Sequence, residues 1–114
     1  MMEIAERFVS GTIVALLKGK MEADTVPMFE RWFDAHMESS IDRVVLDLSG
    51  LSYISSAGLR AILAAAKQLK GQRGLAICGL YGMVGQVFQV SGFVSILETY
   101  PTVEGALQAE SLID

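Results

Sequence analysis

A chain of 114 residues has the length of a single domain, and it is long enough to bury a hydrophobic core without disulfides or bound metals. Hydrophobic residues make up 52% of it and charged residues 19%, which is typical of a globular protein, while the formal net charge of −4 argues against a nucleic-acid surface, which would be basic. No apolar run approaches the length of a membrane-spanning helix, and the acidic start of the chain lacks the basic and apolar regions of a signal peptide.

The chain begins with two predicted strands, residues 4–9 and 12–17, joined by a serine and a glycine that suit a two-residue hairpin turn. A loop over residues 19–24 follows, and it carries two acids, Glu22 and Asp24. The ordinary interpretation of this pair is a solvated turn that caps the next helix, because Asp is a common cap.

A helix is predicted next. Asp24 or Thr25 can cap its start, and Pro27 fits its first turn, where no intrahelical N–H is needed. Met28 and Trp32 widen its apolar stripe, which usually faces the core; a partner-contact patch is the alternative. The stripe itself consists of Val26, Phe29, Phe33 and Met37. The helix is expected to end at Ser39, Ser40 and Asp42.

The central part of the chain runs from a strand into a helix. Residues 43–46 form a short apolar run typical of a strand buried on both faces. A Ser/Gly-rich turn then leads to a helix that begins at Ser55 or Ser56. Serine is a favoured N-cap, because its oxygen accepts a hydrogen bond from an unpaired N–H of the first turn, and negative charge is also favoured there. The local chemistry therefore supports either a plain helix cap or a phosphorylated serine.

The rest of the chain continues the alternation. Residues 70–74 are predicted as a stop and turn, and residues 75–78 as another buried strand. A loop over residues 79–85 leads into a short helix that ends at Gly92, and its G-x-x-G-x-x-G spacing is not the dinucleotide-binding pattern. Residues 93–97 are predicted as the last strand.

Thr102 is expected to cap a final helix. Strands that alternate with helices predict an α/β fold, with a mixed, mostly parallel sheet of about five strands, about four helices and an opening β-hairpin. The sequence contains no repeat, linker or low-complexity segment, so residues 1–114 are predicted to form a single domain.

The sequence offers no recognisable catalytic set. His36 is the only histidine, so neither a histidine metal cluster nor a Ser-His-Asp arrangement is indicated. The nucleophile-elbow and phosphate-binding G-x-x-x-x-G-K-[ST] patterns are also missing. Cys78, the only cysteine, lies in an apolar run, which predicts a packing role and suits a reducing cytoplasm. We therefore expect a non-enzymatic protein with no cofactor and no metal.

Three segments of the chain carry a family resemblance. Residues 47–60, DLSGLSYISSAGLR, resemble the signature of the STAS domain, the fold of bacterial anti-sigma factor antagonists. Residues 19–25, GKMEADT, resemble the family's loop after the second strand, and residues 90–93, VSGF, resemble the end of its third helix. The order of the predicted elements agrees with that fold over essentially the whole chain. Two positions depart from the family pattern: Ser55 stands where an Asp is common, and Ala57 where a second Ser or Thr is common.

The resemblance implies a binding switch. The serine two residues before the glycine accepts phosphate in the family, which corresponds to Ser56 here, with Ser55 as the fallback. The implied partners are a cytoplasmic serine kinase that also acts as an anti-sigma factor, and a serine phosphatase that resets the switch; neither nucleic acid nor membrane insertion is implied. The unphosphorylated form would bind the kinase and release a sigma factor or another output protein. The implied partner-binding residues are Glu22, Asp24, Ser55, Ser56, Ala57, Gly58 and Arg60.

Two other interpretations remain open. One is a STAS subunit that stays in a larger lipid-transport or signalling complex and is never phosphorylated. The other is a small-molecule binder that uses the apolar sheet edge and the loop over residues 79–85.

Overall fold

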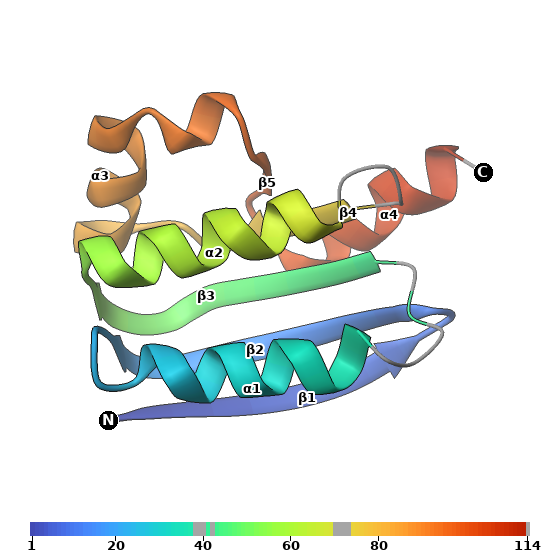
Figure 1. The fold of residues 1–114 in the computed structure, drawn as a ribbon. Helices are drawn as coiled ribbons and strands as arrows, with labels where there is room; N and C mark the ends of the chain where they lie inside the picture. The colour runs from blue at the N-terminus through green and yellow to red at the C-terminus, as the bar shows by residue number, and fades with distance from the viewer. Residues whose placement is uncertain (38–40, 42, 70–73, 114) are drawn as a thin grey trace.

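The computed structural model describes residues 1–37, 41, 43–69 and 74–113, and its five strands form one sheet in the order β1-β2-β3-β4-β5 (Figure 1). Strands β1 and β2 are antiparallel, and every other neighbouring pair is parallel. The predicted mixed, mostly parallel sheet with an opening hairpin is therefore confirmed. The elements are β1 (Met2–Val9), β2 (Thr12–Met21), α1 (Val26–Met37), β3 (Arg43–Ile54), α2 (Ser56–Gln68), β4 (Gly74–Cys78), α3 (Gly82–Ser91), the 3₁₀ helix η1 (Phe93–Ser95), β5 (Glu98–Tyr100) and α4 (Val103–Ile113).

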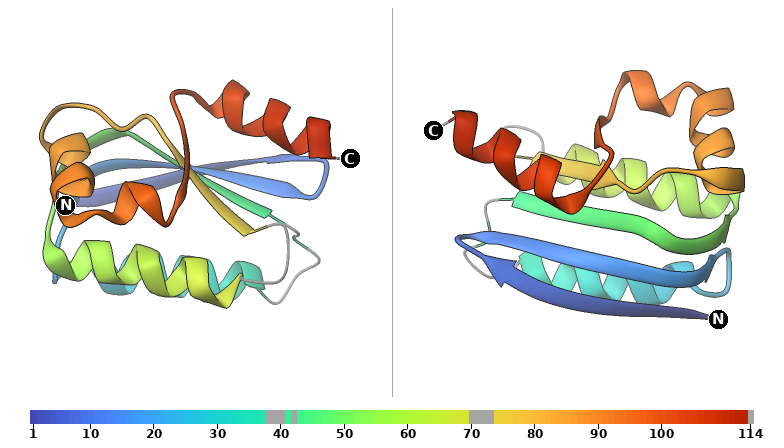
Figure 2. Two further views of the ribbon diagram at one scale, coloured as in Figure 1. Left: turned by 90° about the horizontal axis from the view of Figure 1, so that it is seen from above. Right: turned by 180° about the vertical axis from the view of Figure 1, so that it is seen from behind.

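Helices cover both faces of the sheet, but unequally. Helices α1 and α2 lie side by side on one face, and α4 lies on the other (Figure 2). The larger core lies between the sheet and α1, α2 and α3, which contribute buried side chains such as Phe29, Ile62 and Phe88. A smaller core joins α4 to the central strands through Val103 and Ala106. No helix in the described part of the chain is both long and apolar enough to cross a membrane.

The opening hairpin forms where the sequence predicts it. Ser10 and Gly11 both have positive φ, 48° and 83°, which fits a type I′ turn, and Val9 pairs with Thr12 on either side of them. This turn has the twist that two antiparallel strands need. It therefore sets the register of β1 along the whole of β2.

The central strand is longer than expected. Residues 43–46 were predicted as the strand and the Ser/Gly-rich segment after them as a turn, but β3 continues to Ile54. That prediction was wrong because β2 also continues, to Met21, and keeps β3 paired through two register shifts. Gly50 permits this pairing, since a Cβ there would lie 2.8 Å from the Leu17 carbonyl oxygen. The predicted loop at residues 19–24 is correspondingly shortened to the residues after Met21.

The predicted last strand, residues 93–97, is also wrong. Phe93–Ser95 form the 3₁₀ helix η1, because Gly92 adopts φ 81° at the end of α3 and the Ser95 N–H then donates to its carbonyl. The last strand, β5, begins at Glu98, just after the predicted span, and pairs with residues 76–78 of β4. The predicted helix end at Ser39, Ser40 and Asp42 and most of the predicted turn at residues 70–74 lie outside the described residues.

Candidate functional site

Ser55 determines where helix α2 begins. Its backbone is extended, with φ −93° and ψ 173°, and its Oγ accepts a hydrogen bond from the Gly58 N–H at 3.3 Å. The first intrahelical bond runs from the Leu59 N–H to the Ser55 carbonyl. Ser55 is therefore the N-cap, and Ser56 is the first residue inside the helix. Ser56 is exposed, and its hydroxyl has no hydrogen-bond partner among the described residues.

The loop between β2 and α1 is held by its own hydrogen bonds. Thr25 Oγ1 accepts from the Glu22 N–H and donates to the Lys20 carbonyl, both at 2.9 Å. Thr25 directly precedes α1, but its side chain bonds back into the loop rather than forward into the helix. The Ser55 N–H donates to the Met21 carbonyl at 2.9 Å, which ties this loop to the start of α2.

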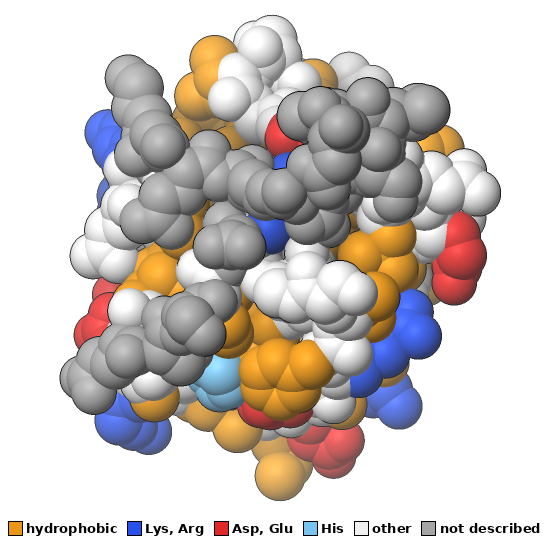
Figure 3. All heavy atoms as spheres, turned by 90° about the vertical axis from the view of Figure 1, so that its right-hand side faces the viewer, with side chains coloured by type: hydrophobic (Ala, Val, Ile, Leu, Met, Phe, Trp, Pro, Cys, Tyr) orange, Lys and Arg blue, Asp and Glu red, His pale blue; other side chains and the backbone are white. Residues whose placement is uncertain are grey.

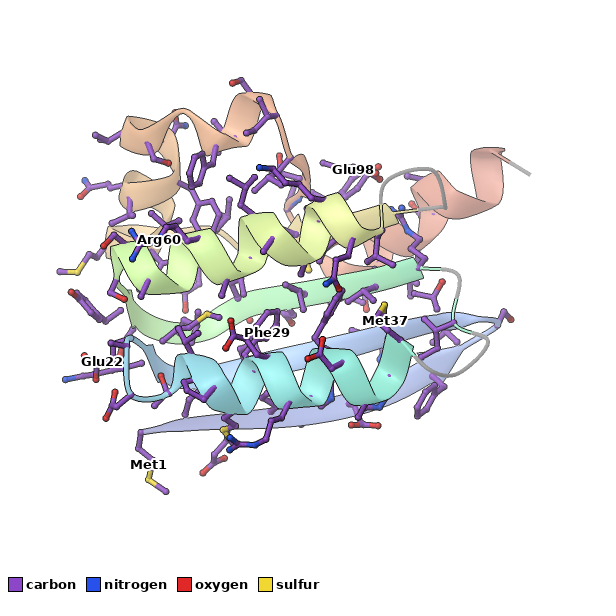
Figure 4. The ribbon with its side chains drawn as sticks, in the orientation of Figure 1. Met1, Glu22, Phe29, Met37, Arg60 and Glu98 are labelled. Carbon is purple, nitrogen blue, oxygen red and sulfur yellow. The ribbon has the colours of Figure 1, made fainter. Side chains whose placement is uncertain are left out.

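These contacts bring most of the predicted site residues together. An open depression of about 610 Å³ lies between the loop and the start of α2. Figure 4 shows Glu22 and Arg60 at this same end of the molecule, one on the loop and one on the first turns of α2. The residues that line the depression are Glu22, Ala23, Asp24, Ser55, Ser56, Ala57 and Arg60.

Gly58 alone among the predicted site residues does not line the depression. It is buried, and a Cβ at this position would lie 2.8 Å from Ile54 Cγ1 and 3.0 Å from the Met21 carbonyl oxygen. The missing side chain lets α2 pack directly against the ends of β2 and β3. Gly58 thus helps to position Ser55 and Ser56, because it lets the start of α2 lie close to the sheet.

The charges around the depression are mixed. Glu22 and Asp24 supply two carboxylates, and Arg60, exposed on α2, supplies a guanidinium. Ser56 and Arg60 are four residues apart on one helix, a spacing that places two side chains on the same face. The first turn of α2 contains no acidic residue, so the partial positive charge at its N-terminus is not offset from within the helix. An anion on Ser56 would thus meet the helix N-terminus and Arg60 on one side and two carboxylates on the other.

Comparison with known proteins identifies the family. The family model for the STAS domain matches residues 3–106. The chain belongs to the STAS domain family. A relative from Bordetella bronchiseptica, whose provisional name is anti-sigma factor antagonist BtrV, is 40% identical over 102 residues, covering 89% of this chain and 88% of the relative.

Solved structures share the fold of this STAS domain. A crystal structure of an anti-sigma factor antagonist from Mycobacterium paratuberculosis has a TM-score of 0.89 at 23% identity and covers 96% of this chain and 93% of its own. The phosphorylated form of the Bacillus cell fate determinant SpoIIAA has a TM-score of 0.71 at 19% identity and covers 94% and 98%. At these identities the likeness concerns the fold alone.

A second hollow in this STAS domain lies beside the loop expected for a small-molecule binder. It has about 540 Å³ and lies between α3, η1 and β5, with Leu80, Tyr81 and Gly82 on one side. None of the described residues lining it is charged. Within the described residues, no group of three or more His, Cys, Asp or Glu is placed to hold a metal ion.

Met28 and Trp32, the two side chains of α1 for which the sequence allows either a core or a partner-contact role, have different environments. Trp32 is half-buried against the core, and its Nε1 donates to Glu6 at 2.9 Å, so it is the core flank that the apolar stripe favours. Met28 is 39% exposed and lies on the same helix.

Sequence reasoning missed the part played by Met21, whose carbonyl connects the loop after β2 to the start of α2. No local signal could have revealed it, because that contact is made by the backbone.

Proposed function

We propose that this STAS domain is an anti-sigma factor antagonist that works as a phosphorylation-controlled binding switch in the cytoplasm. The unmodified protein binds a serine kinase that also holds a sigma factor or another output protein, and the output is released. Phosphate on Ser56 ends that complex, and a serine phosphatase restores it. The observation that carries the proposal is the single depression shared by Ser55 and Ser56, the two acids of the loop and Arg60.

The geometry favours Ser56 over Ser55 as the acceptor. The Ser55 Oγ is already engaged by the Gly58 N–H, and the residue is only partly exposed. Transfer of phosphate to Ser55 would modify the oxygen that makes the N-cap bond at the start of α2. The Ser56 hydroxyl is exposed and has no competing bond within the described part of the structure. A kinase can therefore reach it without disturbing the helix.

The added charge would act on the partner more than on the fold. A phosphoserine carries about −1.5 to −2 charges at neutral pH, and helix N-termini stabilise such anions. The same phosphate would lie at a surface that already holds Glu22 and Asp24. Like charges placed against each other across an interface cost several kcal/mol, and about 1.4 kcal/mol weakens binding tenfold. One phosphate is therefore enough to separate the partners.

The test uses the serine kinase encoded nearest this gene. The purified chain is incubated with that kinase and ATP, and the phosphate is mapped by mass spectrometry. We expect phosphate on Ser56 and none in Ser56→Ala, while Ser55→Ala remains a substrate. Calorimetry should show that Ser56→Ala binds the kinase like the wild type, whereas Ser56→Asp binds at least about tenfold more weakly.

The possible failures are distinct. Phosphate on Ser55 alone would keep the switch and correct the acceptor. If Ser56→Asp and Ser56→Ala both bind as the wild type does, the switch is refuted. Absence of phosphate with every serine kinase of the genome, together with a stoichiometric partner that co-purifies, would instead establish a permanent subunit.

A further inference from the structure

The first strand leaves one side of its backbone open. β1 lies at the edge of the sheet and pairs with β2, and no other described strand pairs with it. Both the front and the rear views show nothing along its outer side (Figures 1 and 2). Open edges of this length are templates for pairing with another strand, and proteins usually protect them. The strand that pairs here must match the backbone groups and side chains that β1 presents.

The hairpin determines which backbone groups face outward. In a two-residue hairpin the residues flanking the turn, here Val9 and Thr12, form a hydrogen-bonded pair, and such pairs alternate along the ladder. The odd-numbered residues of β1 therefore direct their N–H and C=O groups toward β2. The bond from the Lys20 N–H to the Met1 carbonyl at 2.9 Å agrees with this. Met2, Ile4, Glu6 and Phe8 direct theirs to the open side.

Several side chains of this strand are exposed although they are apolar. Met1 is 88% exposed, Phe8 62% and Val9 36%. Phe8 lies beside the single histidine, His36, with ring centroids 6.2 Å apart, and Figure 3 shows this histidine at the surface among hydrophobic side chains. On the opposite face of the strand, Glu3 and Arg7 are exposed, and no ion pair joins either of them to another described residue.

We propose that β1 is a homodimer interface, in which it pairs antiparallel with β1 of a second copy and Ala5 lies opposite Ala5. This inference goes beyond the switch and does not depend on it. In this register Glu3 of each copy lies opposite Arg7 of the other, so that two ion pairs form about one two-fold axis. Phe8 lies opposite Met2, and Val9 lies opposite Met1. Val9 and Met1 thereby cover each other, whereas Met2 is 3% exposed, is already buried within its own copy and offers Phe8 little apolar surface.

Other registers fit less well. A shift by one residue would pair even-numbered with odd-numbered residues. Backbone groups that face the open side would then lie opposite groups that face β2, so no hydrogen-bonded ladder could form. Among the registers of correct parity, one neighbouring alternative places Glu6 opposite Glu6, and the other places Glu3 opposite Ala5. Like charges directly opposite each other are destabilising. The register centred on Ala5 joins opposite charges and leaves only Ile4 with Glu6 as an ill-matched pair.

The dimer leaves the candidate site accessible. Met1 lies near the start of the 22–24 loop, because its carbonyl bonds to Lys20. Antiparallel pairing sends the Met1 ends of the two copies in opposite directions, so the two depressions lie at opposite ends of one continuous sheet. Glu6 keeps its bond from Trp32 Nε1, since both residues lie within one copy. Each copy can therefore bind its own kinase.

Sedimentation equilibrium of the full chain tests the proposal. We expect the mass to rise with concentration from 12.3 kDa toward twice that value. Glu3→Arg and Arg7→Glu should each move the association midpoint at least tenfold higher, because both ion pairs become like-charge pairs, and the double variant should restore it. Glu30→Arg makes the same charge change on the exposed side of α1 and should have no effect. Association that ignores the reversals, or that the double variant does not restore, overturns the proposal.

Disulfide capture detects the same contact if it is weak. Ala5 would face Ala5 as a non-hydrogen-bonded pair with Cα atoms about 4.5 Å apart, within the range that a disulfide spans. Ala5→Cys should therefore form a covalent dimer in oxidised glutathione much faster than Ala64→Cys, an exposed control on α2. The native Cys78 is fully buried and does not interfere. Equal rates for the two variants, with a mass of one chain at every concentration, overturn the proposal.

Discussion

The two serines at the start of α2 should differ sharply in their effect on stability. Ser55→Ala removes the side-chain oxygen that accepts the Gly58 N–H. Loss of an N-cap costs about 0.5–2 kcal/mol, and the length of this bond, 3.3 Å, places the expected cost in the lower half, about 0.5–1 kcal/mol. For 114 residues, an unfolding entropy of about 2.1 cal/mol/K per residue converts this to a fall of roughly 2–4 °C in Tm.

Ser56→Ala is the matched comparison. The residue is exposed inside the first turn, and alanine is the better helix former, so we expect a change below about 0.5 kcal/mol. Ser55→Asp should retain the wild-type stability, because Asp caps as well as Ser and its charge suits the helix N-terminus. Thermal and urea unfolding followed by circular dichroism measure all three variants. An equal loss for both alanine variants, or a loss in Ser55→Asp as large as in Ser55→Ala, would refute the assignment of the cap.

Three further predictions concern the core and the edge of the sheet. Burial raises the pKa of Cys78 to about 12, so the native thiol should resist a maleimide near neutral pH and react only after unfolding; rapid labelling of the folded protein would contradict this. Burial alone would raise the pKa of Glu98, but hydrogen bonds from Arg43 and Tyr100 outweigh it and hold the pKa below the usual value of a glutamate. The stability from these bonds is present above that value and is lost as the pH falls through the lower folded-state pKa. Glu98→Gln should therefore reduce the fall in unfolding free energy that the wild type shows on acidification. An unchanged dependence of the unfolding free energy on pH would argue against this role. Gly79→Ala should lower the unfolding free energy by at least about 2 kcal/mol in urea, because φ is +75° and the new Cβ would lie 2.8 Å from a carboxylate oxygen of β3; wild-type stability would disprove the strain.

The elements that the sequence predicts correctly are those whose own residues determine their structure. The hairpin turn follows from the Ser10-Gly11 pair, and β4 follows from its continuous apolar run. Residues 93–97 were misassigned because a short apolar run does not distinguish a strand from a helical turn. The real last strand, Glu98–Tyr100, carries a charged and two polar side chains at the edge of the sheet. Its pairing depends on where β4 lies, so nothing within these three residues could have revealed it.

The candidate site was predicted by resemblance and not by periodicity. Residues 22–24 and 55–60 are far apart in the chain, and they meet because the Ser55 N–H reaches the Met21 carbonyl. A backbone bond of this kind leaves no mark on residue type. Which of the adjacent serines caps α2 was equally open, because either side chain can serve. The extension of β3 to Ile54 decided it, since it makes Ser55 the last extended residue before the helix.

The division between the two serines has a consequence for the switch. A phosphate on the cap residue would modify the oxygen that accepts the Gly58 N–H, so the hydrogen bond at the start of α2 would change together with binding. A phosphate on Ser56 would leave the cap bond in place, and the free N–H groups of the first turn and Arg60 offer it partial compensation. The fold would then remain constant while the surface charge changes beside Glu22 and Asp24. Under the proposed switch, the domain would be phosphorylated on Ser56 and reset without unfolding, which is what a reversible binding switch requires.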